Sequence, residues 1–211
     1  LPQYRGAAPI NWAVINGDTE TGVTTFFLKQ EIDTGMIIRQ KRLPIADTDN
    51  VGTVHDKLMA MGASLVTETV DLILEGKVET LPQNRLYKDE KELRPAPKIF
   101  KETCRINWMR SLKSIYDFIR GLSPYPAAWT ELVPNDNSSK RQVVKIYQTE
   151  KHMASHSFAI GSIHTDNKNY IDIAVNGGVL RILSLQLAGK KRMSAHDFLN
   201  GFKQLSLFHV E

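Results

Sequence analysis

The apolar residues of this chain follow a strand pattern twice and then a helical one. Residues 22–28, GVTTFFL, are β-branched and aromatic, which is typical of a strand, and residues 35–45, GMIIRQKRLPI, begin in the same way. Pro44 indicates a strand end or a sheet edge. Asn50 is one of three candidate N-caps ahead of residues 51–76, where near-helical spacing predicts one long helix with an apolar face of Val54, Leu58, Met61, Leu65 and Leu72 or Ile73.

The regular pattern is lost between residues 82 and 101. This stretch is charged and contains Pro82, Pro95 and Pro97. Such composition is typical of a linker, so the chain is predicted to have a first unit over residues 1–81 and a second over residues 102–211.

The second unit opens with a helix and continues with short strands. Trp108, Leu112, Ile115 and Ile119 form an apolar stripe at helical spacing, and a Pro-rich turn follows them. A closing helix has Ser194 as its predicted N-cap. Strands are expected at residues 142–148, 160–165, 170–175 and 178–187. About five short strands in a region of about 100 residues indicate a small barrel or sandwich.

Charge divides the 211-residue chain unevenly. Residues 1–96 carry a net charge of −3 and residues 97–211 a net charge of +7, within a total of +4. A basic half suggests a polyanionic partner, although many basic domains bind nothing in particular. No apolar run approaches the roughly 20 residues that span a bilayer, so no membrane contact is expected. The single cysteine, Cys104, cannot form an internal disulfide, which favours a reducing, cytoplasmic location and a structural role for the thiol.

Two short motifs in the first unit could carry chemistry. Asp33, in EIDTG, lies between two predicted strands, where a carboxylate could take part in proton transfer or could simply cap a turn. Arg5 and Gly6, in YRGAAPINW, could bind a carboxylate or phosphate, or could form a plain connection into a helix. The six histidines form no recognisable zinc motif, and no glycine-rich phosphate loop is present.

Clusters of cations occur on several predicted loops. Lys190, Lys191 and Arg192 follow Gly189 between a strand and a helix. Three adjacent cations there could contact an anionic ligand, or could be a solvated charge run. Further cations in or near predicted loops are Lys98, Lys101, Lys140 and Arg141.

Six stretches in this order resemble the 10-formyltetrahydrofolate-dependent formyltransferase family, and within it the bacterial enzymes that act on methionyl-tRNA. They are LPQYRGAAPINWAVINGDTETGVT, EIDTG, PAPKI, INW, IRGLSPYPAAW and LSLQLAGKKRMSAHDFLNG. The first two are shared with the wider family, and the later four resemble the tRNA enzymes in particular.

The resemblance implies an α/β fold. Residues 1–81 would be the C-terminal part of a truncated, Rossmann-like formyltransferase domain with a mostly parallel sheet. Residues 82–101 would be a linker. Residues 102–211 would form a C-terminal OB-type β-barrel domain that helps to hold the initiator tRNA.

The resemblance also implies a reaction and a site. A formyl group would pass from 10-formyltetrahydrofolate to the amino group of methionine on initiator tRNA in translation initiation, with no metal. The family's catalytic trio is Asn, His and Asp, and its Asp falls on Asp33. The folate-binding Ser-Leu-Leu-Pro segment falls partly on Leu1 and Pro2, and the backbone of Glu31, Ile32 and Asp33 would lie near the pterin. The loop near the active site would be formed by Tyr4, Arg5 and Gly6. Contacts with tRNA would be made by Lys98, Lys101, Lys140, Arg141, Lys190, Lys191 and Arg192.

The chain departs from the family pattern at its first residue. In the family, the Asn and His precede the position of Leu1, so the 211-residue chain alone is expected to be inactive. The intact enzyme is expected to be monomeric, whereas half a sheet would leave an open edge through which the fragment could self-associate.

Two other functions remain open at this stage. A sugar-nucleotide N-formyltransferase or a formyltetrahydrofolate hydrolase would share the folate loop and the DTG motif, but neither should need the basic tail. Alternatively, residues 102–211 could act only as a tRNA-binding module.

Overall fold

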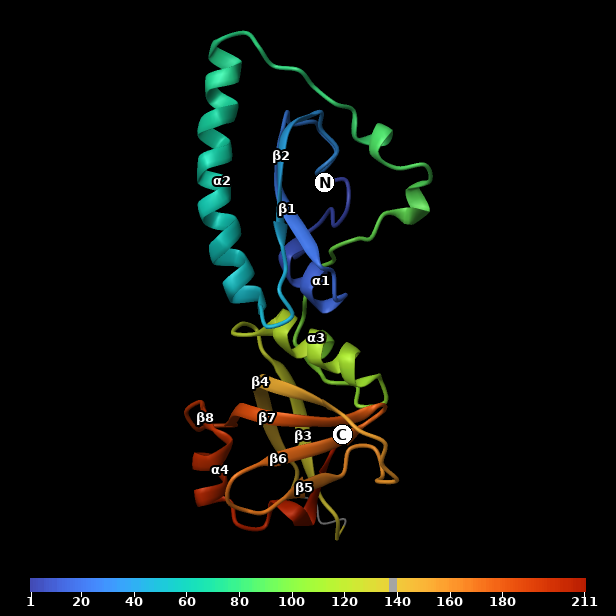
Figure 1. Ribbon diagram of the computed structural model, residues 1–211, viewed down its shortest axis with the longest axis vertical. Coiled ribbons are helices and arrows are strands. Elements are labelled where there is room, and N and C mark those ends of the chain that lie inside the picture. Colours follow the sequence, from blue (N-terminus) through green and yellow to red (C-terminus); the bar gives the residue numbers. More distant parts are fainter. Residues whose placement is uncertain (137–139) are drawn as a thin grey trace. The chain divides into compact units, whose positions relative to one another are not determined.

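The computed structural model describes residues 1–136 and 140–211. The chain forms two compact units, Leu1–Ile99 (unit 1) and Phe100–Glu211 (unit 2), which are described separately (Figure 1).

Unit 1 is built on a two-stranded antiparallel sheet. Strands β1 (Glu20–Phe26) and β2 (Ile37–Pro44) pair from Glu20↔Pro44 to Phe26↔Ile37. They are antiparallel because a short loop joins them directly, whereas parallel strands need a long crossover. The resemblance implied a mostly parallel sheet, but the sheet in the described part of unit 1 is antiparallel.

Two helices accompany this sheet. Helix α1 (Pro9–Ile15) precedes β1, and helix α2 (Val51–Leu74) follows β2 and runs beside the hairpin (Figure 1). Their apolar faces meet in one core whose buried members are Tyr4, Ala13, Val14, Ile45, Val54, Leu58 and Ala96.

Helix α2 confirms the long helix predicted from the sequence. Its N-cap is Asn50, whose side chain accepts a hydrogen bond from the Thr53 amide at 2.9 Å, while the Asn50 amide donates to the Thr53 hydroxyl at 3.0 Å. This reciprocal pair satisfies backbone donors that the first turn leaves free. Beside the buried face, the helix carries an exposed apolar stripe, called here the α2 stripe, formed by Met59, Val66, Val70 and Ile73.

The segment predicted to be a linker is largely packed onto unit 1. It contains the short 3-10 helices η1 (Gln83–Leu86) and η2 (Glu90–Glu92). Ala96 is fully buried, and its carbonyl accepts a hydrogen bond from the Ala7 amide at 2.7 Å. A side chain on Gly6 would place its Cβ 2.4 Å from the Ala96 carbonyl oxygen, so glycine permits this contact. The boundary between the two units falls between Ile99 and Phe100.

Unit 2 combines helices with a curved sheet. Its helical elements are η3 (Glu102–Cys104), α3 (Leu112–Leu122), α4 (Ala195–Gly201) and η4 (Leu205–Leu207). Its strands are β3 (Ala128–Pro134), β4 (Gln142–Met153), β5 (Ile163–Thr165), β6 (Ile171–Val175), β7 (Gly178–Leu187), β8 (Met193–Ser194) and β9 (Phe208–Val210). Ser194 caps α4 as predicted, accepting a hydrogen bond from the Asp197 amide.

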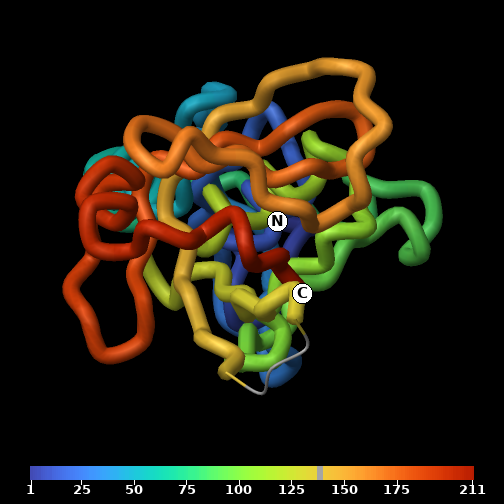
Figure 2. The backbone as a smooth tube through the Cα atoms, turned by 90° about the horizontal axis from the view of Figure 1, so that it is seen from below, coloured from blue at the N-terminus to red at the C-terminus, as the bar shows by residue number. Residues whose placement is uncertain are grey.

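The strands of unit 2 curl into a nearly closed barrel. They lie in the order β5-β6-β7-β4-β3-β9, with β8 beside β7, and the curl can be followed in Figure 2. The two ends approach each other, because the Val210 amide donates to the Gly161 carbonyl at 3.0 Å and Ser162 bridges His209. Phe198 and Leu205 are buried at the apolar interior that these strands enclose. Of the two architectures that the strand spacing left open, a small barrel or a sandwich, the structure has the barrel as its coarse form.

Among the residues described, no helix has both the length and the apolar content to cross a membrane.

Candidate functional site

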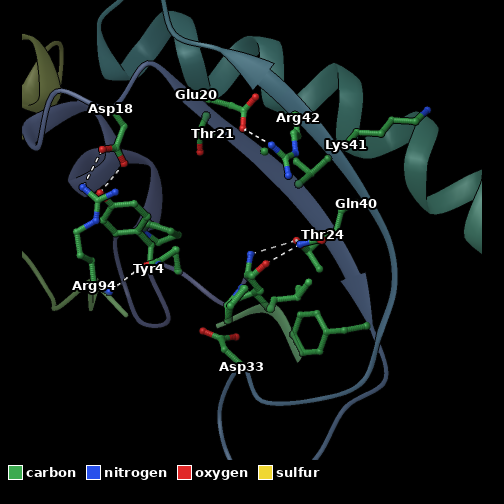
Figure 3. Close-up of a pocket in the computed structure, with 18 of the residues that line it drawn as sticks. Tyr4, Asp18, Glu20, Thr21, Thr24, Asp33, Gln40, Lys41, Arg42 and Arg94 are labelled. Atoms are coloured by element: carbon green, nitrogen blue, oxygen red, sulfur yellow. Dashed lines mark hydrogen bonds and ion pairs between the residues drawn. The ribbon is translucent and has the colours of Figure 1, made fainter. Parts of the chain in front are cut away.

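An open pocket of about 720 Å³ lies in unit 1 beside β1 (Figure 3). It is lined by the first residues of the chain, by β1 and β2, by Asp33 from the loop between them, and by Leu86 and Arg94 from the segment after α2. Its volume falls within the range of small-molecule sites, roughly 300–1,000 Å³. Segments far apart in the sequence therefore build one site.

Asp33 is oriented by the YRG segment. Its backbone adopts φ 58°, a left-handed conformation that Asp tolerates in turns, and the Gly6 amide donates to its Oδ2 at 3.1 Å. Figure 3 shows Asp33 at the edge of the pocket. The carboxylate thus accepts a hydrogen bond from a distant loop and lines the pocket, and its part in proton transfer stays a prediction.

Gln83 holds the Asp33 loop in place and was missed by the sequence analysis. Its amide nitrogen donates to the carbonyls of Asp33 and Gly35, each at 2.8 Å, and its oxygen accepts from Arg5 at 2.8 and 3.2 Å. Only 4% of Gln83 is exposed. The predicted carboxylate or phosphate partner of Arg5 is thus replaced, in this structure, by a neutral amide. No periodicity marks Gln83 in a Pro-rich segment, so no sequence signal could have found it.

Tyr4 and Arg94 form a second fixed part of the wall. The Tyr4 hydroxyl donates to Asp18 Oδ2 at 2.6 Å, and Arg94 donates to Asp18 Oδ1 at 2.8 Å while its guanidinium lies 5.0 Å from the Tyr4 ring centre (Figure 3). Burial, together with the hydrogen bond to Asp18, raises the pKa of Tyr4 to about 12. Tyr4 therefore stays protonated at neutral pH and acts as a donor.

The predicted folate residues divide into two groups. Leu1 and Pro2 line the pocket together with Asp33. Glu31 and Ile32 lie outside its lining, and 79% of Ile32 is exposed. Their contact with the pterin stays a prediction.

The predicted cations of the basic half also differ in their surroundings. Arg141 donates to Glu211 at 2.7 Å and to Glu131 at 3.4 Å. Lys190 and Lys191 are exposed on the connection between β7 and β8. Lys140 is also exposed in unit 2, as is Lys101, whereas Lys98 belongs to unit 1. Their contacts with tRNA stay a prediction.

Two other candidate chemistries find no support in the described part of the chain. No cluster of His, Cys, Asp and Glu there could hold a metal ion. Cys104 is buried, its thiol donates to the Phe100 carbonyl at 3.2 Å, and burial raises its pKa, which suits a structural thiol.

Known proteins resemble the chain over both units. Residues 1–70 match the family model described as Formyl transferase, and residues 98–203 match Formyl transferase, C-terminal domain. Proteins named methionyl-tRNA formyltransferase are 71% identical over 210 residues in Parabacteroides distasonis and 62% identical over 211 residues in Bacteroides fragilis. The chain is covered completely in both comparisons but spans 64% of the length of each relative.

Solved structures support the same fold. HypX from Aquifex aeolicus in complex with tetrahydrofolic acid has a TM-score of 0.65 at 16% identity, covering 96% of this chain and 34% of that chain. WlaRD, a sugar 3N-formyl transferase, has a TM-score of 0.62 at 20% identity, covering 90% of this chain and 63% of that one. With family models matched in both units and high identity to the named relatives, the chain belongs to the formyl transferase family.

Proposed function

We propose that this protein transfers a formyl group from 10-formyltetrahydrofolate to the amino group of methionyl-initiator-tRNA, in the cytoplasm. The observation that carries the proposal is 71% identity, over the whole chain, to a protein named methionyl-tRNA formyltransferase. The pocket of unit 1, with an oriented carboxylate, is the place we assign to the reaction.

The chemistry gives Asp33 a defined role. The amine attacks the formyl carbon, its C–N bond forms, the bond from the formyl carbon to the folate nitrogen breaks, and one proton must pass from the amine to the leaving nitrogen. A fixed carboxylate can accept or relay that proton, and it favours a charged imidazolium beside it. Hydrogen bonds from the Gly6 amide and from the Gln83 side chain hold Asp33 in place for this task.

The pocket suits the folate co-substrate in size and in polar groups. Folate has a flat aromatic ring system with hydrogen-bonding edges, and the lining combines Leu1, Pro2 and Phe26 with the polar side chains of Thr24 and Gln40. The resemblance implies a reaction without a metal. In such a reaction, these residues need only bind and orient the substrates and transfer a proton.

Asp33→Asn in the protein expressed from its complete reading frame tests the catalytic assignment. We expect kcat/KM for formylation of methionyl-tRNA to fall at least about 100-fold, the usual contribution of a general acid or base. Glu79→Gln removes one exposed carboxylate outside the pocket lining and serves as the charge-matched control. Wild-type kinetics in Asp33→Asn would refute the assignment.

For unit 2 we infer an OB-type barrel that grips tRNA phosphates. Its short antiparallel strands, near closure and helix α4 packed at the interior support this assignment. Charge supports the partner, because residues 97–211 carry +7. The test is filter binding of initiator tRNA at several salt concentrations. Combined alanine substitution of Lys190, Lys191 and Arg192 should lower the salt slope by about 0.9 for each phosphate that is no longer neutralised, and unchanged affinity would contradict the inference.

A further inference from the structure

Arg192 differs from the ion-paired arginines of unit 2 in what holds it. Several of these arginines donate to a carboxylate at 2.7–2.9 Å, which cancels much of their charge; they are Arg105, Arg120, Arg141 and Arg181. Arg192 has no carboxylate partner within the described part of the chain. The two groups that its side chain contacts, the Ser184 hydroxyl and the Tyr147 ring, are neutral, so they do not cancel its positive charge.

Two neutral groups fix the Arg192 side chain. Its guanidinium carbon lies 4.4 Å from the centre of the Tyr147 ring, and its Nε donates to the Ser184 hydroxyl at 2.8 Å. A ring face and one hydrogen bond define the plane of a guanidinium. Because only Nε is used, the four N–H bonds of the terminal nitrogens remain for a ligand.

The surrounding loop is fixed by the same strands. The Tyr147 hydroxyl donates to Gln186 at 2.6 Å, and the Gln186 amide donates to the Lys190 carbonyl at 2.7 Å. Beyond the loop, Met193 pairs with Leu185 across β7 and β8. Tyr147 on β4 is therefore connected both to the Arg192 side chain and to the backbone that carries Lys190.

We infer that Tyr147 is a positioning residue that holds Arg192 ready to bind a phosphate of the RNA backbone. A planar guanidinium matches phosphate in a bidentate geometry, and a side chain fixed in advance loses less entropy when it binds. The exposed Lys190 and Lys191 on the same loop add positive charge beside it. This inference rests on the proposed binding of tRNA and assigns a distinct task to a residue without charge.

A double-mutant cycle on the 211-residue chain tests the inference. Binding of an initiator tRNA transcript is measured by filter binding between 0.05 and 0.3 M salt, where the Debye length falls from roughly 14 Å to roughly 6 Å. Arg192→Ala should weaken binding about eightfold at about 0.1 M salt and lower the salt slope by about 0.9. Tyr147→Ala should weaken binding about two- to fivefold, the worth of an exposed cation–π contact. It should also lower the slope although it removes no charge, and it should have no further effect in the Arg192→Ala background.

Matched variants keep the result interpretable. Tyr147→Phe keeps the ring against Arg192 and removes only the hydroxyl bond to Gln186, so it should retain the wild-type salt slope. Lys203→Ala removes one exposed charge of unit 2 that has no assigned contact. Circular dichroism and thermal unfolding check that each variant is folded. Equal losses from Tyr147→Ala in both backgrounds, or an unchanged salt slope, would overturn this inference alone. Absence of salt-dependent binding by the wild-type chain would overturn the RNA-binding proposal as well.

Discussion

Replacing Gln83 should loosen the candidate active site without touching any residue that is expected to react. Its amide nitrogen is bonded to two carbonyl oxygens and its oxygen to Arg5. Two neutral hydrogen bonds contribute about 1 kcal/mol each, and a bond to a charged group about 1.5 kcal/mol at the lower end of its range. The lower end applies because Arg5 is only half-buried and can regain water. Gln83→Ala should therefore lower the free energy of local opening by about 3.5 kcal/mol.

Gln83→Glu is the sharper variant, because it keeps the size of the side chain. The new carboxylate still accepts from Arg5, but it loses both N–H donors and places an oxygen against the carbonyls of Asp33 and Gly35. Two acceptors facing each other without a proton repel, so we expect a loss comparable with that of alanine. A gain in stability from the new ion pair would contradict this account.

Amide hydrogen exchange measures the effect locally, which matters in a chain of two units. The reporters are the Gly6 amide, bonded to Asp33, and the Phe27 amide, bonded to the Met36 carbonyl at 3.0 Å. About 3.5 kcal/mol corresponds to roughly 300-fold faster exchange at these amides. Gln3→Ala is the control, since Gln3 also bridges two backbone groups but in an exposed setting. Wild-type exchange rates in Gln83→Ala would refute the reasoning.

Three further changes have defined outcomes. Gly35→Ala would put a Cβ 1.6 Å from the Phe27 carbonyl oxygen, so it should cost more than about 3 kcal/mol in urea unfolding; a loss below about 1 kcal/mol would contradict the geometry. The backbone N–H of Asn169 leads the interactions that lower the pKa of Asp166. Stability from this carboxylate is therefore present above about pH 4 and is lost as the pH falls towards its folded pKa, so the difference in Tm between wild type and Asp166→Ala should shrink below about pH 4. Val66→Lys, in the exposed α2 stripe, should reduce self-association of the 211-residue chain in sedimentation velocity, and a wild-type chain that stays monomeric at high concentration would contradict that expectation.

The local order of apolar and polar residues was sufficient to predict a strand or helix whose own sequence shows a clear period. Strand β7 spans the ten predicted residues, since alternating apolar side chains fill a half-buried strand between two turns. Strand β1 begins and ends two residues earlier than predicted, because Phe27 and Leu28 are apolar but exposed. Strands β3 and β9 were missed: the first follows a Pro-rich turn, and the second has only three residues.

The site depended more on contacts between distant segments. EIDTG and YRG could be singled out from residue types, and the structure brings them together through the Gly6 amide. Gln83 forms hydrogen bonds with both segments, and it lies about 50 residues after Asp33, within a stretch predicted to be a linker. Polar residues in irregular segments carry no periodicity, so burial of this kind cannot be predicted from the chain alone.

The cations of unit 2 also differ in contacts that the sequence does not predict. In the sequence, Arg141 and Arg192 are equivalent, since each follows a lysine on a predicted loop. In the structure, two carboxylates bind Arg141, whereas an aromatic ring and a hydroxyl hold Arg192. An anion must compete with Glu131 and Glu211 for Arg141, and it meets no such competitor among the contacts of Arg192 in the described part of the chain. The contribution of a cation to RNA binding thus depends on what its side chain already contacts, and neighbours in space, not in sequence, decide that.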